Sequence, residues 1–210
     1  MKARLKNIVA RTVTPALKER GFKKAGDRFV RGDAVVQLVD VQFSRWDNPN
    51  EASFTLNCGV WMSGVTSTYR NTAEPASPKL ADCCISARVG MLTDSRLDVW
   101  WTVRQDDPSE LDESTERAVV TALSGAVLPF LRRFETAEAI AEFLSAPLTG
   151  PDRLLDPRAE VMRVAYATAA WATLGQAARR DECLARATAL AKTGPVKDII
   201  AGFASRVRGP

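Results

Sequence analysis

Gly21-Phe22-Lys23-Lys24 leads into Ala34-Val-Val-Gln-Leu-Val-Asp-Val-Gln-Phe-Ser44, and this stretch decides how the fold begins. The preceding residues 5–20 have the apolar spacing of a helix. We expect that helix to kink or restart at Thr14-Pro15, because proline lacks an amide proton. Gly21 can adopt the left-handed conformation that ends a helix, with Phe22 folding back on its last turn. The stretch therefore predicts a helix that stops at Gly21 and gives way to strands.

The strand over residues 34–44 has two chemically different faces, because successive side chains point to opposite sides of a sheet. Val39, Val41 and Phe43 share one face. The next predicted strand, residues 53–62, repeats the division. A register that keeps the apolar faces together would place the following polar side chains on the other face: Asp40, Gln42, Ser44, Thr55 and Asn57. We take this set as a candidate binding surface; the alternative is the ordinary solvent face of a sheet covered on one side.

Further strands are predicted over residues 28–31, 85–92 and 97–104, with a turn at Thr93-Asp94-Ser95 between the last two. Residues 63–82 read as a surface loop with a short helix near its end. Short connections between strands favour an antiparallel meander. We therefore predict an α+β fold in which a sheet of about five strands carries helices on one face.

The second half of the chain is predicted to be helical, over residues 114–134 and 136–145. Asp156-Pro157 resembles a cap and first turn for a new helix. Residues 159–207 indicate two or three helices broken at Arg180-Asp181 and Gly194-Pro195. We expect an α+β domain at residues 1–145, a linker at residues 146–158 and a helical hairpin extension at residues 159–210.

Composition excludes several chemistries. The chain of 210 residues has no histidine, so it cannot build a Ser-His-Asp nucleophile, an imidazole base or a Cys/His zinc site by itself. The four scattered cysteines, without a Cys-x-x-Cys pair, indicate buried thiols in a reducing compartment. No apolar run is long enough for a membrane-spanning helix. We expect a bacterial, cytoplasmic protein with no metal site, no cofactor and no catalytic residues.

Charge is distributed unevenly along the chain. Residues 1–31 hold ten Lys and Arg against two acids, a local charge of +8, and residues 94–116 hold eight acids against two Arg, a local charge of −6. The helix spacing predicts an exposed basic stripe of Arg4, Arg11 and Lys18, extended by Lys23 and Lys24. The stripe is either a solvated face or a contact for an acidic protein or a nucleic-acid backbone. No aromatic side chain is interleaved with it to stack a base, which disfavours nucleic acid.

Trp100 and Trp101 are adjacent in a predicted strand and should point to opposite faces. Trp101 is expected in the core. Trp100 is expected on the polar side with Asp98 and Arg104, where it could anchor a partner or a flat ligand. The alternative is that residues 63–82 fold over it. Trp100 and Arg104 complete the set of candidate binding residues.

The order of several short motifs resembles the bacterial domain of unknown function 4304 family over about residues 3–145. The resemblance rests on the following pieces: Leu17-Lys-Glu-Arg-Gly21-Phe22-Lys23-Lys24, Val41-Gln42-Phe43-Ser44, Phe54-Thr-Leu-Asn57-Cys-Gly59-Val60, Arg88-Val-Gly-Met-Leu92, Trp100-Trp101 and Leu128-Pro129-Phe130-Leu131. It supports the fold and a bacterial origin, and it implies no activity or catalytic residues. Families of this kind sometimes lie near contact-dependent toxin loci, an association that suggests an immunity role by analogy.

These observations favour a non-catalytic protein-binding module, in the form of an immunity or accessory protein that uses the polar sheet face and Trp100. Two alternatives stay open. One is a small-ligand binder or carboxylate-based enzyme in which Asp40, Gln42, Asn57 and Arg104 converge under residues 63–82 and the pKa of Asp40 is raised. The other is a protein that binds nucleic-acid backbone through the basic stripe.

Overall fold

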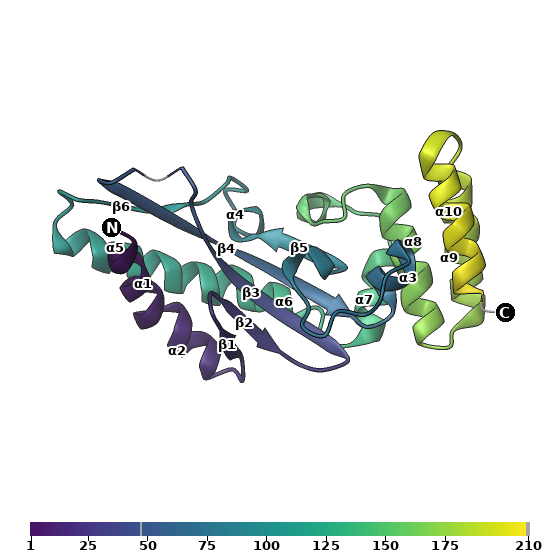
Figure 1. The fold of residues 1–210 in the computed structure, drawn as a ribbon, viewed down its shortest axis with the longest axis horizontal. Coiled ribbons are helices and arrows are strands. Elements are labelled where there is room, and N and C mark those ends of the chain that lie inside the picture. Colours follow the sequence, from purple (N-terminus) through teal and green to yellow (C-terminus); the bar gives the residue numbers. More distant parts are fainter. Residues whose placement is uncertain (47, 209–210) are drawn as a thin grey trace. The chain divides into compact units, whose positions relative to one another are not determined.

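The computed structural model describes residues 1–46 and 48–208, and it is an α+β fold as predicted. Figure 1 shows the sheet and its helices. The strands are β1 (Lys23–Ala25), β2 (Arg28–Arg31), β3 (Val35–Phe43), β4 (Glu51–Met62), β5 (Ile85–Arg88) and β6 (Trp101–Arg104). The longer helices are α1 (Lys2–Arg11), α5 (Ser109–Ala122), α7 (Ala137–Ser145), α8 (Glu160–Thr173), α9 (Ala177–Leu190) and α10 (Gly194–Val207). The shorter ones are α2 (Val13–Lys18), α3 (Val65–Arg70), η1 (Leu80–Asp82), α4 (Val89–Leu92), the π-helical turn η2 (Leu123–Val127), α6 (Leu128–Arg132) and η3 (Gly150–Leu154).

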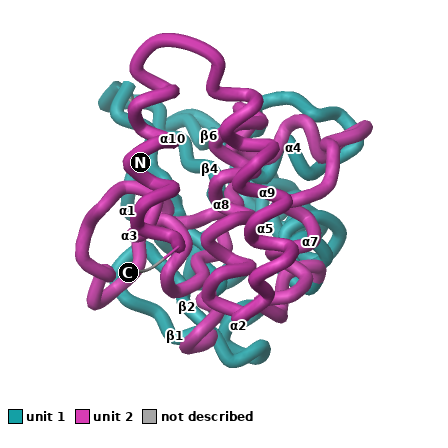
Figure 2. Tube along the Cα trace, turned by 90° about the vertical axis from the view of Figure 1, so that its right-hand side faces the viewer, with its two compact units in different colours: residues 1–31, 37–58, 87–132 teal, residues 32–36, 59–86, 133–210 magenta. Residues whose placement is uncertain are grey.

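The chain divides into two compact units, which Figure 2 distinguishes by colour. Unit 1 comprises residues 1–31, 37–58 and 87–132, and unit 2 comprises residues 32–36, 59–86 and 133–210. The units therefore interleave along the chain, whereas the sequence indicated a single break over residues 146–158. The domain boundaries drawn from the sequence stay a prediction.

The sheet has the strand order β1-β2-β3-β4-β5, and β6 also pairs with β4. Its register places Arg28 opposite Asp40 and Phe29 opposite Val39. The predicted pairing of the last two strands around Thr93-Asp94-Ser95 is wrong, because each of them pairs with β4 instead. The predicted strand over residues 85–92 stops at Arg88, where the chain leaves the sheet through α4 and rejoins it at Trp101. Residues 89–100 thus form an excursion between two short strands.

The start of the fold follows the sequence closely. The break between α1 and α2 lies at Thr12, ahead of Pro15, because Pro15 cannot donate to the Arg11 carbonyl and the helix must restart before it. At the break, the buried Thr12 hydroxyl donates to the Ile8 carbonyl. Pro15 is accommodated in the first turn of α2, where its missing amide proton costs no helical hydrogen bond. Gly21 has the expected positive φ of 80°, and the Phe22 amide donates to the Leu17 carbonyl. The helix stop at Gly21 is confirmed.

The core of unit 1 lies between one face of the sheet and its helices. Phe54 and Trp101 are opposite each other in the register of β4 and β6, and their ring centroids are 5.2 Å apart. Gln37, on the same face as Val39, donates to the Leu131 carbonyl of α6 at 2.7 Å. Figure 1 shows α5 and α6 behind the strands. The orientation predicted for Trp101 is confirmed, since only 8% of it is exposed.

Unit 2 is mainly helical, and within it α9 and α10 pack as a hairpin, as predicted. The break before α9 lies at Gly175, which has a φ of 70°, and not at Arg180-Asp181. The break at Gly194 is confirmed. Asp156 is not a helix cap: it exchanges two backbone hydrogen bonds with Ser86, and α8 begins only at Glu160. Residues 63–82 contain α3 in addition to the short helix expected near their end.

No helix within residues 1–46 and 48–208 has both the length and the apolar character needed to cross a membrane. All four cysteines are buried thiols, as predicted.

Candidate functional site

The polar sheet face of unit 1 carries a hydrogen-bonded network centred on Arg88, at the end of β5. Its guanidinium donates to both carboxylate oxygens of Asp98, at 3.0 and 2.8 Å, and to Asn57 Oδ1 at 3.3 Å. It also approaches Gln42 Oε1 at 3.4 Å. Asn57 Nδ2 donates to the same Gln42 oxygen at 2.8 Å, which joins β3, β4 and β5 through side chains.

Trp100 completes this network, which we call the Arg88 cluster (Gln42, Asn57, Arg88, Asp98 and Trp100). The Trp100 indole Nε1 donates to Asp98 Oδ2 at 3.0 Å. The Arg88 guanidinium carbon lies 5.2 Å from the Trp100 ring centroid, within the range of a cation–π interaction. Trp100 is half-buried, so one part of its ring stays available at the surface.

The cluster is held in one geometry by its own contacts. Burial disfavours the charged form of Asp98, but the hydrogen bonds from Arg88 and Trp100 outweigh it, and the pKa of this carboxyl lies below its ordinary value. A carboxylate of low pKa is a weak proton acceptor near neutral pH. The arrangement therefore fits a fixed contact surface better than a general base.

The alternative for the polar face was an ordinary solvent-exposed side of the sheet. The structure does not agree with this, because part of the face is buried. Thr55 is fully buried and Asn57 is 6% exposed. The Thr55 hydroxyl has no hydrogen-bond partner among the described residues. The alternation of side chains along β4 predicted that Thr55 and Asn57 lie on the polar face of the sheet. It could not predict that Arg88 would cover Asn57.

Asp40 lies beside the cluster rather than in it. It is half-buried, and its carboxylate Oδ1 is 3.7 Å from Arg28 Nε, across from it on β2. Burial raises the pKa of Asp40, the Arg28 charge opposes this rise, and the Asp27 charge adds to it. The raised pKa matches the expectation for the ligand-binding alternative, but the partner is Arg28 and not Gln42 or Asn57.

Two other candidates lie apart from the cluster. Arg104 pairs with Glu51 at 3.0 Å, at the far end of β4, and most of its side chain is exposed. The predicted convergence of Arg104 with Asp40 is therefore not observed. The hydroxyl of Ser44 accepts from the Trp46 amide and helps the chain turn after β3.

Arg88 and Asp98 are the site residues that the candidate set omitted. The sequence contained a pattern that could have pointed to each of them. Arg88 alternates with the buried Ile85 and Ala87 in β5, and Asp98 precedes Trp100 by two positions. Their meeting could not be read from the sequence, because it depends on the excursion that returns residues 98–100 to the end of β5.

The predicted basic stripe is partly neutralised within unit 1. Arg4 forms an ion pair of 2.8 Å with Asp112 and donates to the backbone carbonyls of Arg104 and Asp107. Arg11 Nε lies 3.0 Å from Glu116 Oε1. Two stripe residues are thus paired with acids of α5, and Lys18, Lys23 and Lys24 remain exposed.

No group of three or more Cys, Asp or Glu side chains in the described part of the chain is placed to hold a metal ion. Two of the buried thiols, Cys58 and Cys84, are poor nucleophiles. Burial raises the pKa of Cys58, and it raises that of Cys84 to about 12.

The comparisons with known proteins give one family. A family model described as "Domain of unknown function (DUF4304)" matches residues 13–133. No match was found among curated proteins or among solved structures.

Proposed function

We infer the function of this chain from its own geometry, because the chain belongs to the DUF4304 family, whose description states no activity. We propose that it is a non-catalytic protein-binding module and that the Arg88 cluster is its contact surface. The observation that carries the proposal is a half-buried tryptophan fixed by an arginine and a carboxylate on a sheet face.

Fixing Trp100 before binding favours association. A partner that binds a mobile tryptophan must order its side chain, whereas here the Asp98 hydrogen bond and the Arg88 guanidinium already hold it. Tryptophan and arginine are also the residues that most often dominate binding energy at protein interfaces. The cluster therefore combines a rigid anchor with polar groups around it.

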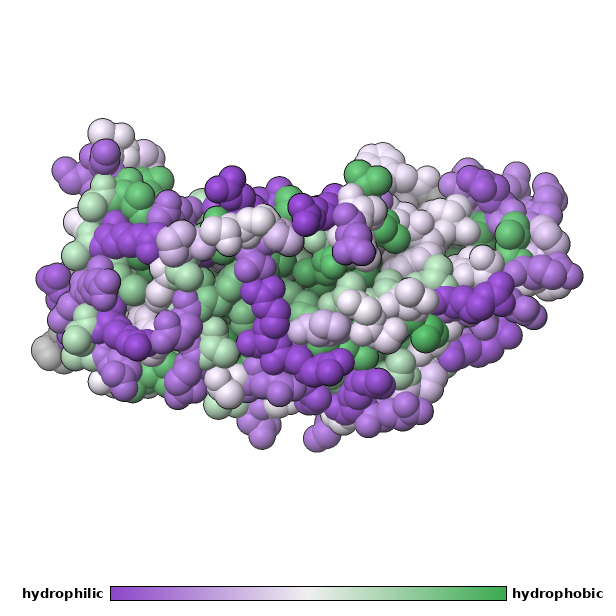
Figure 3. Space-filling model, turned by 180° about the vertical axis from the view of Figure 1, so that it is seen from behind, coloured by the Kyte–Doolittle hydropathy of each residue, from purple (hydrophilic) through white to green (hydrophobic). Residues whose placement is uncertain are grey.

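Two large apolar side chains of unit 1 are exposed, and one of them, Leu97, directly precedes Asp98 of the cluster in the chain. Trp46, after β3, is 95% exposed, and Leu97, next to Asp98, is 67% exposed. Contiguous apolar surface bordered by polar residues is typical of interaction sites. On the face drawn in Figure 3, apolar residues are visible between hydrophilic ones.

The chemistry of the cluster argues against catalysis as the main role. The chain has no histidine, the pKa of Asp98 is low, and the Arg88 donors are directed at its own neighbours. General acid–base catalysis requires a group whose pKa lies near the working pH. Asp98, whose pKa is lowered, does not meet this requirement.

The proposal is tested by a quantitative pull-down from the native host with wild-type protein, Trp100→Ala and Arg104→Gln. Arg104→Gln removes an exposed ion pair outside the cluster and serves as the matched control. We expect a partner that is enriched by wild type and by the control but lost with Trp100→Ala, with a drop in affinity of about 30-fold or more. Equal enrichment by all three proteins, or no specific partner at all, would contradict the proposal. Near-ultraviolet circular dichroism checks that Trp100→Ala is folded.

A small-ligand site beside Asp40 is the second candidate, favoured by one observation. Asp40 has a raised pKa, and the fully buried Thr55 hydroxyl on the same face has no partner among the described residues. A ligand that accepts from the hydroxyl and donates to Asp40 would satisfy both. Screening small amides and alcohols by NMR would show shifts at Asp40 and Thr55 if this site exists, and none if it does not.

An immunity or accessory role is the finer form of our proposal. It places the protein in a bacterial cytoplasm, for which the four buried thiols give support. The neighbouring genes provide the direct test. A large secreted toxin encoded next to this chain would favour immunity, and a metabolic operon would count against it.

A further inference from the structure

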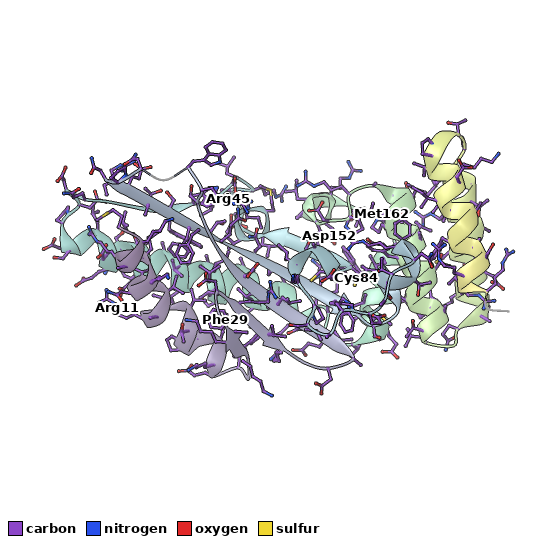
Figure 4. The ribbon with its side chains drawn as sticks, viewed as in Figure 1. Arg11, Phe29, Arg45, Cys84, Asp152 and Met162 are labelled. Carbon is purple, nitrogen blue, oxygen red and sulfur yellow. The ribbon has the colours of Figure 1, made fainter. Side chains whose placement is uncertain are left out.

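A cavity of about 370 Å³ lies within unit 2, and none of the residues that line it belongs to the Arg88 cluster. It is bounded by the end of α3, by η1, and by the first turns of α8, where Figure 4 labels Met162. The side chains that matter here are Arg70, Leu80, Ser86, Arg158, Met162 and Tyr166. A cavity of this size is within the range that small organic ligands occupy.

Arg70 lies at one edge of the cavity, and only some of the N–H groups of its guanidinium have close partners. One terminal nitrogen donates to the Ala81 carbonyl at 2.7 Å. The other lies 3.7 Å from Asp82 Oδ1, too far for a strong charge-assisted hydrogen bond. The second oxygen of that carboxylate accepts from the Lys79 amide at 2.8 Å, so Asp82 is directed toward the backbone of η1.

The opposite edge is built by a backbone bridge. Ser86 and Asp156 exchange hydrogen bonds of 3.1 and 2.8 Å, which brings residues 156–158 to the cavity. Arg158 Nε then lies 3.5 Å from Asp156 Oδ1, and 59% of each side chain is exposed. This pair is also looser than a direct charge-assisted contact.

A comparison within unit 2 shows that these two distances are long. Arg133 binds both oxygens of Asp152, at 2.8 and 2.9 Å. At the cavity, by contrast, the distances to the carboxylates are 3.7 Å for Arg70 and 3.5 Å for Arg158. Both guanidinium groups therefore keep donors that an incoming anion can take.

The floor of the cavity combines one hydroxyl with apolar side chains. Tyr166 is 3% exposed, and Arg70 lies within hydrogen-bonding reach of its side chain. Burial is the main cause that raises the pKa of Tyr166, so the hydroxyl stays protonated near neutral pH and can donate. Leu80 and Met162 supply an apolar wall.

We propose that this cavity binds a small amphiphilic anion, with a carboxylate or phosphate-ester head at Arg70, Arg158 and Tyr166 and a short apolar group against Leu80 and Met162. Planar guanidinium groups match both head groups geometrically. The site is independent of the contact surface proposed above.

The test uses the full chain and four probes: butyl phosphate, butyrate, inorganic phosphate and butylammonium. Isothermal titration calorimetry should give a dissociation constant of about 1 mM or tighter for at least one butyl anion. Inorganic phosphate should bind at least about fivefold more weakly than butyl phosphate, because it lacks the apolar group. Tighter binding of butyl phosphate would assign a phosphate ester as the ligand head, and tighter binding of butyrate a carboxylate.

Variants locate the binding. Arg70→Gln and Arg158→Gln should each weaken the best anion about tenfold or more, since each removes a charge-assisted contact. Arg179→Gln is the matched control, because Arg179 pairs with Glu142 in the same unit and does not line the cavity. It should bind the anion as wild type does. Arg158→Gln removes only an exposed ion pair with a long distance, so this variant should fold. It therefore still tests the proposal if Arg70→Gln does not fold.

Three outcomes would overturn the proposal. One is that neither butyl phosphate nor butyrate binds at concentrations up to about 10 mM, where a ligand of the expected affinity would nearly saturate the site. Another is equal affinity in wild type and both cavity variants. The third is butylammonium binding as tightly as the anions, which would exclude the arginines as the source of selectivity.

Discussion

Arg88 joins three strands through its side chain, and its loss should be visible first at Asp98. In the folded protein the hydrogen bonds from Arg88 and Trp100 keep the pKa of Asp98 below its ordinary value, against the opposing effect of burial. Arg88→Gln removes the charge, so the pKa of Asp98 should rise toward about 3.9. A carbon-detected NMR titration measures this directly. Arg104→Gln should leave Asp98 unchanged.

The same interaction has a defined effect of pH on stability. A carboxyl whose pKa is lowered by folding stabilises the folded state above its unfolded value, and this contribution is lost as pH falls through the lowered pKa. Arg88 and Asp98 are 31% and 48% exposed, so solvent screens the pair and its contribution should stay below about 1 kcal/mol. Urea unfolding at neutral pH and below about pH 4 should show wild type and Arg88→Gln converging in acid.

Asp40 should act in the opposite sense. Burial raises its pKa, so its contribution to stability is present at low pH and is lost as pH rises through the raised value. Asp40→Asn removes this titration and should flatten the dependence of unfolding free energy on pH above about pH 4. Urea unfolding across a pH series tests it. An unchanged slope in Asp40→Asn would show that another group is responsible.

At the scale of elements, Gly90 permits the excursion over residues 89–100. A Cβ atom at this position would lie 1.8 Å from the Leu97 carbonyl oxygen and 2.7 Å from the Val99 amide nitrogen. Gly90→Ala should therefore destabilise the protein by about 1–3 kcal/mol and displace Asp98 and Trp100. Gly125→Ala in η2 is the control, since nothing lies within 4 Å of its added Cβ. Thermal unfolding and the Trp100 indole resonance report the two effects.

The end of α7 depends on a buried arginine of α8. Arg163 is 3% exposed and donates to the Leu144 carbonyl at 3.0 Å and to the Ala146 carbonyl. Arg163→Met would keep most of the packing but leave these carbonyls without their donor, so we expect a loss of about 1–3 kcal/mol. Urea unfolding measures it. Arg179→Gln, an exposed arginine of the same unit, should change stability by less than about 1 kcal/mol.

At the scale of the whole molecule, pairing within unit 1 neutralises part of the basic stripe. The basic N-terminal helix and the acidic α5 lie in unit 1, where Arg4 and Arg11 bind Asp112 and Glu116. We therefore expect no shift of nucleic acid by the wild-type protein at about 50 mM salt, where backbone contacts are still strong. Asp112→Asn with Glu116→Gln removes the negative charges that Arg4 and Arg11 neutralise, and this variant should gain a weak, salt-sensitive affinity for nucleic acid. A salt-sensitive shift by the wild type would contradict this account.

Local signals determined much of the fold. The stop at Gly21, the alternation along β3 and β4 and the break at Gly194 follow from backbone freedom and side-chain period, which act over a few residues. The π-helical turn η2 and the strand end at Arg88 were not predicted. In both places a regular helix or strand is interrupted. Such interruptions depend more on tertiary packing than on the helix or strand propensity of the residues.

The candidate site shows the same division. By itself, the sequence determined that Gln42 and Asn57 share a polar face and that Trp100 and Trp101 point to opposite sides. Only the tertiary structure decided that Arg88 covers that face, that Arg104 is far from it and that Asp40 pairs with Arg28. The physical reason is that alternation fixes the direction of a side chain along its own strand. Which side chains meet depends on how the chain returns between strands, and here residues 89–100 bring Asp98 and Trp100 back to Arg88.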